Sequence, residues 1–169
     1  MTKAPHTRRA LLLTGAAAGA ALTTTASGLL VPAQAAGLAP TPTMRGGANN
    51  YRPGAALMDR IGGGGFAMSG TVRRAGDGAP LPGVRIQIWA HTTEGYESDP
   101  ESHGATLTDA DGVFRIDMPQ IVPAFGQPHA HLAYDSDYDE NGFETVFLRP
   151  VMSSSRDTSL ETHFVLQPA

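Results

Sequence analysis

Short runs of alternating hydrophobic and polar residues recur along the second half of the chain. From Val84 to His91, the hydrophobic residues Val84, Ile86 and Ile88 alternate with more polar ones. A period of two residues is that of a β-strand with one buried face. Trp89 falls on the otherwise polar face, where a lone tryptophan either covers a small secondary cluster or forms the wall of a pocket.

Several other segments have the composition or the alternation of short strands, and turn-forming residues separate them. These segments are 67–74, 103–108, 113–118, the strand that contains His129 and His131, 143–149 and 160–167. The turn at 109–112 predicts that 103–108 and 113–118 form a hairpin. About seven short strands without a convincing amphipathic helix predict an all-β fold, a β-sandwich. The pattern leaves the order of the strands open.

Residues 1–35 have the three parts of a signal peptide. A basic start with Lys3, Arg8 and Arg9 precedes a run rich in alanine and leucine, and 33–35 reads A-Q-A, an A-x-A cleavage pattern. The two adjacent arginines resemble a twin-arginine export motif, and an ordinary secretory signal is the alternative. The pattern predicts an exported protein, periplasmic or extracellular, with no membrane span after cleavage.

Residues 36–66 form a segment rich in glycine and proline between the signal peptide and the predicted sandwich domain, 67–169. This composition predicts an extended arm or linker. A few apolar side chains would let the arm lie partly over the domain, and the rest of it would be mobile; these side chains are Tyr51, Leu57, Met58 and Ile61. No chemical role is predicted for it.

The chain has no cysteine, and its charge is acidic. Disulfides, thiolate metal sites and cysteine nucleophiles are therefore excluded, so any metal ligand must come from His, Tyr, Asp, Glu or water. Removal of 1–35 would take three basic residues and no acidic one, leaving 9 basic against 16 acidic residues, a net charge of −7. An acidic surface argues against nucleic acid and anionic membranes as partners.

His129 and His131 stand two residues apart in one predicted strand. Successive side chains of a strand point to opposite faces, so these two imidazoles point the same way and can bind one metal ion. Pro128 favours an extended start to this strand. The alternative is a solvated polar face, which the spacing alone does not exclude.

Short motifs follow one another along the domain in a characteristic order. They are Ile88-Trp89, Gly95-Tyr96, Leu107-Thr108-Asp109-Ala110-Asp111-Gly112, Pro128-His129-Ala130-His131, Phe143-Glu144-Thr145-Val146-Phe147-Leu148 and Thr162-His163-Phe164-Val165-Leu166. Together they resemble the core of the intradiol ring-cleavage dioxygenases, the catechol and protocatechuate dioxygenases. The strand and turn pattern is also similar to non-enzymatic transthyretin-like and carboxypeptidase-regulatory sandwiches, a similarity of fold that carries no function.

The resemblance implies a β-sandwich that holds a non-haem ferric ion, Fe(3+), with two tyrosinates and two histidines. Carried over, Tyr96, His129 and His131 match three of those ligands. Phenolate and imidazole donors suit ferric iron, which then acts as a Lewis acid on a bound catecholate. The implied reaction cleaves a catechol-type aromatic ring between its two hydroxylated carbons with dioxygen.

The chain departs from the family pattern at positions with chemical roles. Residues 121–126, just before the histidine pair, contain no second tyrosine, and Gln127 stands where the family has an arginine. Residues 145–146 read Thr-Val in place of Thr-Gln, and the interval from Trp89 to Tyr96 is one residue shorter than expected. The missing phenolate weakens the preference for ferric iron, and the missing arginine removes a charge that would stabilise an anionic substrate ring.

Other residues near these motifs offer further donors. His91 and His103 could supply a third nitrogen, although a histidine in a polar loop is more often solvated. Tyr134 lies an odd number of residues from His131 and would point to the opposite face.

The loop 135–142 has alternating acidic residues like a calcium loop, but it lacks the glycine and the final acid of the helix–loop–helix calcium site. An acidic hairpin loop is the other interpretation.

Two functions remain open from the sequence. The first is an exported iron dioxygenase with His129, His131 and Tyr96 as ligands. The second is a non-catalytic metal-binding or adhesive β-sandwich that retains the histidine pair. A phenolate-to-iron absorption band would favour the first, and a colourless protein that binds zinc or copper equally well would favour the second. No oligomeric state follows from the sequence.

Overall fold

The computed structural model describes residues 37–169, in which the chain forms seven strands and one short 3-10 helix. The strands are β1 (Phe66–Arg74), β2 (Arg85–Ala90), β3 (His103–Leu107), β4 (Val113–Met118), β5 (Ala130–Tyr134), β6 (Val146–Leu148) and β7 (Ser159–Leu166), and the helix is η1 (Pro100–Ser102). These elements confirm the all-β prediction. The predicted signal peptide, 1–35, lies outside the described residues. Within 37–169, no helix has the length and hydropathy needed to cross a membrane.

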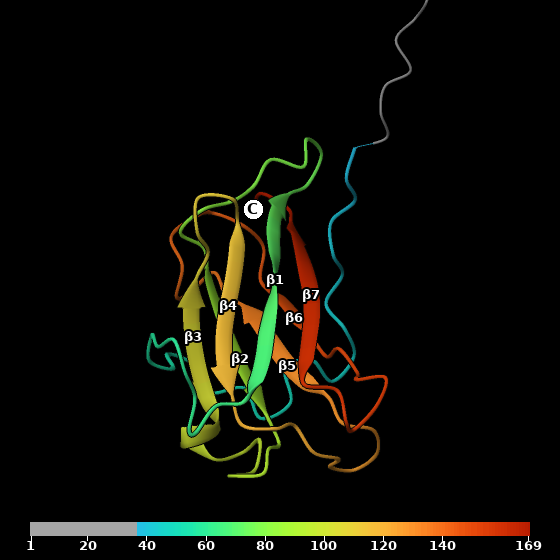
Figure 1. Ribbon diagram of the computed structural model, residues 1–169. Helices are drawn as coiled ribbons and strands as arrows, with labels where there is room; N and C mark the ends of the chain where they lie inside the picture. The colour runs from blue at the N-terminus through green and yellow to red at the C-terminus, as the bar shows by residue number, and fades with distance from the viewer. Residues whose placement is uncertain (1–36) are drawn as a thin grey trace, which may run out of the picture. The chain divides into compact units, whose positions relative to one another are not determined.

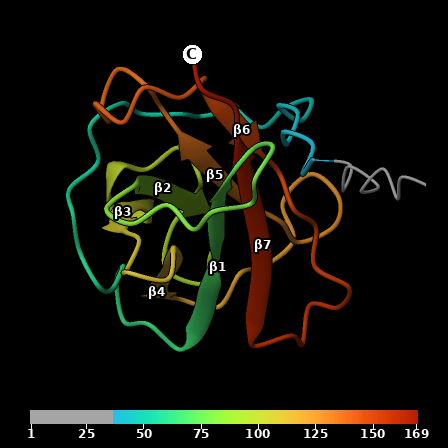
Figure 2. The same ribbon diagram turned by 90° about the horizontal axis from the view of Figure 1, so that it is seen from above.

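The strands form two sheets (Figure 1, Figure 2). One sheet has the order β4-β1-β7 and the other the order β3-β2-β5-β6. β1 and β7 run parallel, whereas the other neighbours are antiparallel. Both sheets contribute apolar side chains to one core, among them Phe66, Ile86, Phe114, Leu132 and Phe164. The arrangement is the predicted β-sandwich, in which alternate residues of each strand face the other sheet.

The predicted hairpin of 103–108 and 113–118 is wrong. β3 pairs with β2 and β4 pairs with β1, so the two strands lie in different sheets. The turn between them does form, because the side chain of Asp109 accepts hydrogen bonds from the backbone N–H groups of Asp111 and Val113. A tight turn reverses the chain without choosing the partner of either strand, and here the chain changes sheets at the turn.

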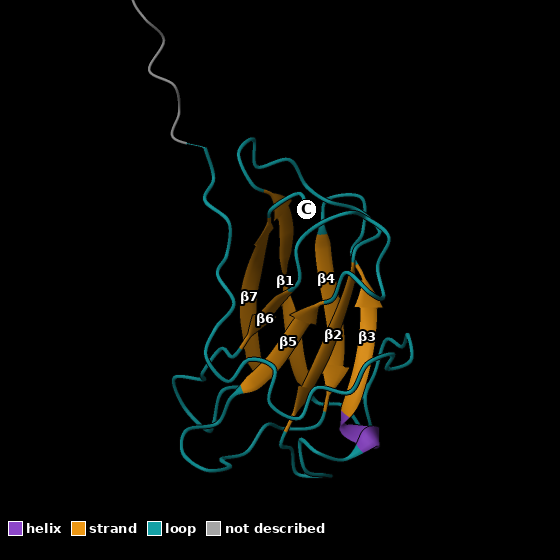
Figure 3. Ribbon diagram, turned by 180° about the vertical axis from the view of Figure 1, so that it is seen from behind, coloured by secondary structure: helices purple, strands orange, loops and turns teal. Residues whose placement is uncertain are grey.

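The arm, residues 37–65, lies against the sandwich and crosses the outer side of the four-stranded sheet (Figure 3). Backbone N–H groups of the arm donate hydrogen bonds to four strands. Thr41 donates to β7 and Met44 to β6, and further along the arm Met58 donates to β3 and Ile61 to β4. The arm therefore covers the face of β2 and β5 that the alternation left to solvent. This is why almost every residue of both strands is buried, although the sequence pattern predicted one buried face.

Gly70 allows β1 to lie close to both of its neighbours. A Cβ atom at this position would overlap the carbonyl oxygen of Thr162 on β7 and would lie 2.6 Å from the ring of Phe114 on β4. We expect Gly70→Ala to lower the free energy of unfolding by about 1–3 kcal/mol, the usual cost of overpacking. Urea unfolding measures this loss, with Ser69→Ala on the same strand as the control. An unchanged unfolding midpoint in Gly70→Ala would contradict the observed packing.

Candidate metal centre

The two histidines of the predicted site lie where β5 begins. His131 is in β5 and lies opposite Trp89 of β2, whereas His129 precedes the strand and forms an isolated bridge with Val151. Ala130, between them, belongs to the hydrophobic core. Both imidazoles therefore lie on the other side of the sheet, with ring centroids 5.0 Å apart, as their spacing predicts.

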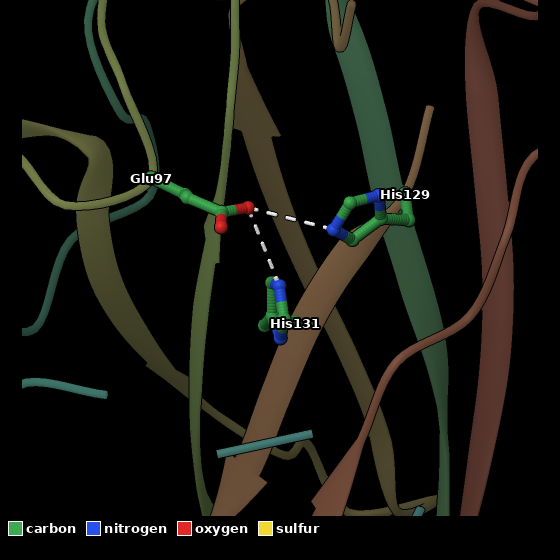
Figure 4. A group of neighbouring side chains, drawn as sticks. All are labelled: Glu97, His129 and His131. Atoms are coloured by element: carbon green, nitrogen blue, oxygen red, sulfur yellow. Dashed lines mark ion pairs between the residues drawn. The ribbon is translucent and has the colours of Figure 1, made fainter. Parts of the chain in front are cut away.

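Glu97 completes a cluster with these histidines (Figure 4). Its Oε2 atom lies 3.4 Å from Nε2 of His129 and 3.4 Å from Nε2 of His131. The three donor atoms all lie within 4.8 Å of one another. The side chains are nearly closed to solvent, with 14% of Glu97, 4% of His129 and none of His131 exposed. We call these three residues the Glu–His–His cluster.

Two donor atoms of the cluster have no hydrogen-bond partner among residues 37–169; they are Oε2 of Glu97 and Nε2 of His131. Buried polar atoms without a partner cost free energy, and such atoms in a native protein point to a missing ion or water. Donors that bind one ion at about 2.1 Å lie about 3.4 Å apart when the angle at the ion is tetrahedral. The separations between Glu97 and the histidines therefore fit a metal ion.

The second nitrogen of each imidazole binds a backbone carbonyl. Nδ1 of His131 donates to the carbonyl oxygen of Gly47 over 3.0 Å, and Nδ1 of His129 donates to that of Gln127 over 2.8 Å. A carbonyl oxygen only accepts hydrogen bonds, so each Nδ1 carries a proton, and in the neutral ring Nε2 then presents a lone pair. The neutral form of both histidines is thus the tautomer that binds a metal through Nε2.

His131 lies in an aromatic stack that excludes water. Its ring is 5.2 Å from Trp89 and nearly parallel to it, and His103 stacks against Trp89 at 5.4 Å. Burial lowers the pKa of His131 from its ordinary value, although the hydrogen bond to Gly47 and the charge of Glu97 act in the opposite sense. The lowered pKa favours the neutral imidazole, which is the form that binds metals.

Tyr96, the ligand implied by the family resemblance, lies on the surface. The residue is 66% exposed, and its ring packs edge-on against His91 at a centroid distance of 4.9 Å. Glu97, the next residue, faces the histidines. The interval from Trp89 to Tyr96 is one residue shorter than in the family, and Glu97 stands at the expected interval. Glu97 was missed because the resemblance specifies a tyrosine there, and a ligand role for Tyr96 stays a prediction.

The half-buried Tyr51 and the buried Tyr134 are held as neutral phenols. Burial raises the pKa of Tyr51, and the hydrogen bond that its hydroxyl donates to Asp135 raises it further. Burial also raises the pKa of Tyr134, whose hydroxyl accepts a hydrogen bond from the backbone N–H of Phe143. Tyr134 belongs to the core, which confirms that it points away from the face of His131.

His103 and Asp139 both have protein partners. Nε2 of His103 lies 3.0 Å from the carbonyl oxygen of Glu97, and its Nδ1 lies 3.4 Å from the amide nitrogen of Gln87. In the loop 135–142, the buried acid Asp139 accepts hydrogen bonds from backbone N–H groups through both carboxylate oxygens. Within 37–169 the acidic residues of this loop form no cluster suited to a metal, which favours the acidic-loop interpretation over calcium.

Arg149 places a positive charge beside the cluster. Its guanidinium nitrogen Nη2 lies 3.5 Å from Nδ1 of His129, and the residue directly follows β6. Burial is the main reason for the low pKa of His131, and the charge of Arg149 adds to it. A cation thus lies near the histidine pair even though Gln127 stands where the family has an arginine.

Several solved structures of dioxygenases are similar to this chain. 3-Chlorocatechol 1,2-dioxygenase from Rhodococcus opacus 1CP is 16% identical, with a TM-score of 0.57 over 79% of this chain and 74% of that one. Hydroxyquinol 1,2-dioxygenase from Pseudomonas putida DLL-E4 is 16% identical, with a TM-score of 0.55 over 78% and 68%. The dioxygenase domain of a dioxygenase and carbohydrate-binding fusion from Streptomyces sp. SirexAA-E is 21% identical, with a TM-score of 0.54 over 78% and 100%.

No protein-family model matches the sequence, and no curated protein does. The similarity is therefore one of three-dimensional structure at low sequence identity. The chain has the fold of the intradiol ring-cleavage dioxygenases, which confirms at the level of the fold the resemblance carried by its motifs. Its cluster of one carboxylate and two imidazoles is a candidate metal site on that fold.

Proposed function

We propose that the protein is a non-haem iron dioxygenase that cleaves a catechol-type aromatic ring between its two hydroxylated carbons with dioxygen. The likeness in fold to catechol-type 1,2-dioxygenases supports the reaction class. The observation that carries the proposal is the pair of buried atoms without partners, Oε2 of Glu97 and Nε2 of His131, which lie close together beside His129.

Iron would be held by Glu97, His129 and His131. One carboxylate and two imidazoles are the donor set typical of ferrous non-haem oxygenases. When bound, iron supplies a Lewis acid for a catecholate and a redox partner for dioxygen. The ferric state implied by the family resemblance depends on a phenolate ligand, so it stays a prediction that is tied to Tyr96.

The residues around the cluster would orient its ligands and stabilise an anionic substrate. The carbonyl groups of Gly47 and Gln127 fix the two imidazole rings, and Trp89 covers one face of His131. The guanidinium group of Arg149 lies beside His129 on the Nδ1 side of its ring, and its positive charge would favour the approach of an anionic catecholate. This cation would replace the arginine that the family carries before its histidine pair.

A hollow at the surface lies beside the segment that carries Glu97, and a substrate could bind there. Its volume is about 470 Å³, and its lining residues are Asn50, Tyr51, Arg52, Pro53 and Ser98. Asn50 donates a hydrogen bond to Oε1 of Glu97 over 2.7 Å, and Ser98 follows Glu97 in the chain, so the hollow lies against the cluster. Tyrosine and proline side chains offer apolar surface to an aromatic ring.

Ring cleavage under labelled dioxygen tests the proposed reaction. The iron-loaded protein is incubated with catechol, hydroxyquinol and chlorocatechol under ¹⁸O₂, and the products are analysed by mass spectrometry. We expect a ring-opened dicarboxylic acid in which each new carboxyl group carries one labelled oxygen atom. His129→Ala/His131→Ala, treated in the same way, should give no product. The absence of a labelled product from every catechol would contradict the proposal.

The burial of the cluster favours a second candidate function, a metal-binding or adhesive β-sandwich without catalysis. Structural metal sites are closed, whereas catalytic sites keep an open position for a ligand. Little of the Glu–His–His cluster is exposed. A chromophoric catechol such as 4-nitrocatechol distinguishes the two functions: a spectral shift on addition to the iron-loaded protein indicates an open position, and no shift favours the non-catalytic function.

We also propose that the protein is exported through the twin-arginine-like signal at 1–35. The Arg8-Arg9 pair before an apolar run supports this proposal. A reporter fused to residues 1–35 should leave the cytoplasm of cells with a twin-arginine system, and Arg8→Lys/Arg9→Lys should retain it. Equal export of both fusions would favour an ordinary secretory signal.

A further inference from the structure

The arm contacts two members of the Glu–His–His cluster through one short turn, residues 46–50, here called the arm turn. The side-chain amide of Asn50 donates to Oε1 of Glu97 over 2.7 Å. The carbonyl oxygen of Gly47 accepts from Nδ1 of His131 over 3.0 Å. A segment remote in sequence from either residue therefore binds Oε1 of Glu97 and Nδ1 of His131, and it leaves Oε2 and Nε2 facing each other.

The backbone conformation of the arm turn requires the residue types found at Gly46, Gly47 and Asn50. Asn50 has a φ of 57° and Gly46 a φ of 73°, both in the left-handed region that asparagine and glycine tolerate best. A Cβ atom on Gly47 would lie 2.8 Å from the carbonyl group of Phe147 on β6. Only glycine lets the chain approach β6 closely enough to present this carbonyl to His131. Left-handed residues other than glycine are concentrated at functional sites.

The arm turn is also fastened to the sheet beneath it. The indole N–H of Trp89 donates to the carbonyl oxygen of Asn49 over 2.9 Å. The ring of Tyr51, just after the turn, lies 5.5 Å from Trp89 and 5.0 Å from Phe147, and its hydroxyl donates to Asp135. These contacts join the turn to β2, to β6 and to the loop after β5, so it is held in one position relative to the histidines.

We propose that the arm turn is a positioning element of the metal centre, in which Asn50 orients Glu97 and the carbonyl group of Gly47 orients His131. The inference rests on the metal site of the proposed function. A hydrogen bond to Oε1 of Glu97 leaves Oε2 for the ion, and partners of this kind fix the direction of metal ligands. Metal binding and docking of the turn are then linked, so each strengthens the other by the same factor.

Cobalt(II) binding to the full chain tests the role of Asn50. Asn50→Gly keeps the left-handed backbone and removes only the amide, so folding is preserved. We expect a loss of about 10–100-fold in Co(II) affinity, the range for removal of a partner that orients a metal ligand. The visible absorption of bound Co(II) should change as well, while the urea unfolding midpoint of the metal-free protein stays at the wild-type value. Asn49→Gly is the matched control, because the Asn49 side chain makes no hydrogen bond with the described residues.

Hydrogen exchange tests the linkage from the other side. Bound Co(II) should slow the exchange of the backbone amides at 47–51 in the wild type and should do so much less in Asn50→Gly. Wild-type affinity together with a wild-type Co(II) spectrum in Asn50→Gly would overturn the inference. If Glu97→Gln loses Co(II) and Asn50→Gly does not, the arm-turn inference fails and the metal site stands. If the wild type binds no Co(II), both fail.

Discussion

Glu97→Gln is expected to lower the iron affinity of the protein by more than about 100-fold, beyond the 10–100-fold loss that follows removal of an outer partner. The change keeps the size of the side chain but replaces an anionic oxygen donor with a neutral amide. Oε2 of Glu97 lies 3.4 Å from Nε2 of both histidines, so the variant loses the charge and the donor at the centre of the cluster. Competition with a chelator under anaerobic conditions measures the affinity for Fe(II).

Tyr96→Phe is the matched variant, because Tyr96 is the neighbouring residue and the ligand implied by the family resemblance. Because Tyr96 is 66% exposed, we expect it to contribute little to iron binding, and Tyr96→Phe should stay near the wild-type affinity. The iron protein should then be colourless in the region of phenolate-to-iron absorption. A visible band that Tyr96→Phe removes would place the phenolate on the iron and would restore the ferric ligand set of the resemblance.

Trp89→Ala is expected to lower the free energy of unfolding of the metal-free protein by about 3–5 kcal/mol, the range for deletion of a large buried aromatic side chain. Trp89 is fully buried, and its ring lies between the imidazoles of His103 and His131. Its indole N–H also binds the arm at Asn49. Loss of the ring therefore opens a cavity at the place where the arm, the sheet and the cluster meet. Urea unfolding measures the change.

Trp89→Phe separates the packing of the ring from its hydrogen bond. Phenylalanine keeps an aromatic ring between the two imidazoles but has no N–H for the carbonyl oxygen of Asn49. The unpartnered carbonyl can turn to water, so we expect Trp89→Phe to lose less stability than Trp89→Ala. Trp89→Ala with wild-type stability would show that the arm and the aromatic stack do not support the sandwich in solution.

The strands could be predicted from sequence because their alternation is a direct consequence of a core on one side. The bounds of β4, Val113–Met118, agree with the segment predicted from the pattern, and the histidine pair lies on one face as its spacing requires. The sequence pattern does not contain the pairing of strands. Asp109 and Gly112 predict a turn, and the turn is present, but the partners of β3 and β4 are chosen by the packing of two sheets.

The role of the arm could not be predicted because it depends on backbone groups. Its apolar side chains predicted that the arm lies partly over the domain, but they carry no sign that its backbone groups contact the cluster. Every residue has a backbone carbonyl group, so the sequence cannot show that the one of Gly47 binds His131. Asparagine is common in turns, so the sequence does not show that Asn50 binds Glu97. Both residues contact the cluster through partners more than forty positions away in the chain, so the local sequence does not reveal these contacts.

Two cues in the sequence point to neighbouring residues, Glu97 and Tyr96, as the third donor. The interval from Trp89 indicates the place of the third donor, and the residue type implied by the family indicates its neighbour, Tyr96. The structure brings the carboxylate to the histidines and leaves the phenol at the surface. The distance along the loop from β2 determines which side chain reaches the face of β5, and here it is the side chain of Glu97.

The iron content of the reconstituted protein tests the central claim most directly. The full chain and His129→Ala/His131→Ala are loaded with Fe(II) without oxygen, desalted, and analysed for iron and protein. The Glu–His–His cluster predicts an equimolar amount of iron in the wild type and none above background in the variant, with both proteins folded. Equal iron in the two proteins, or no iron in either, would contradict a metal centre formed by Glu97, His129 and His131.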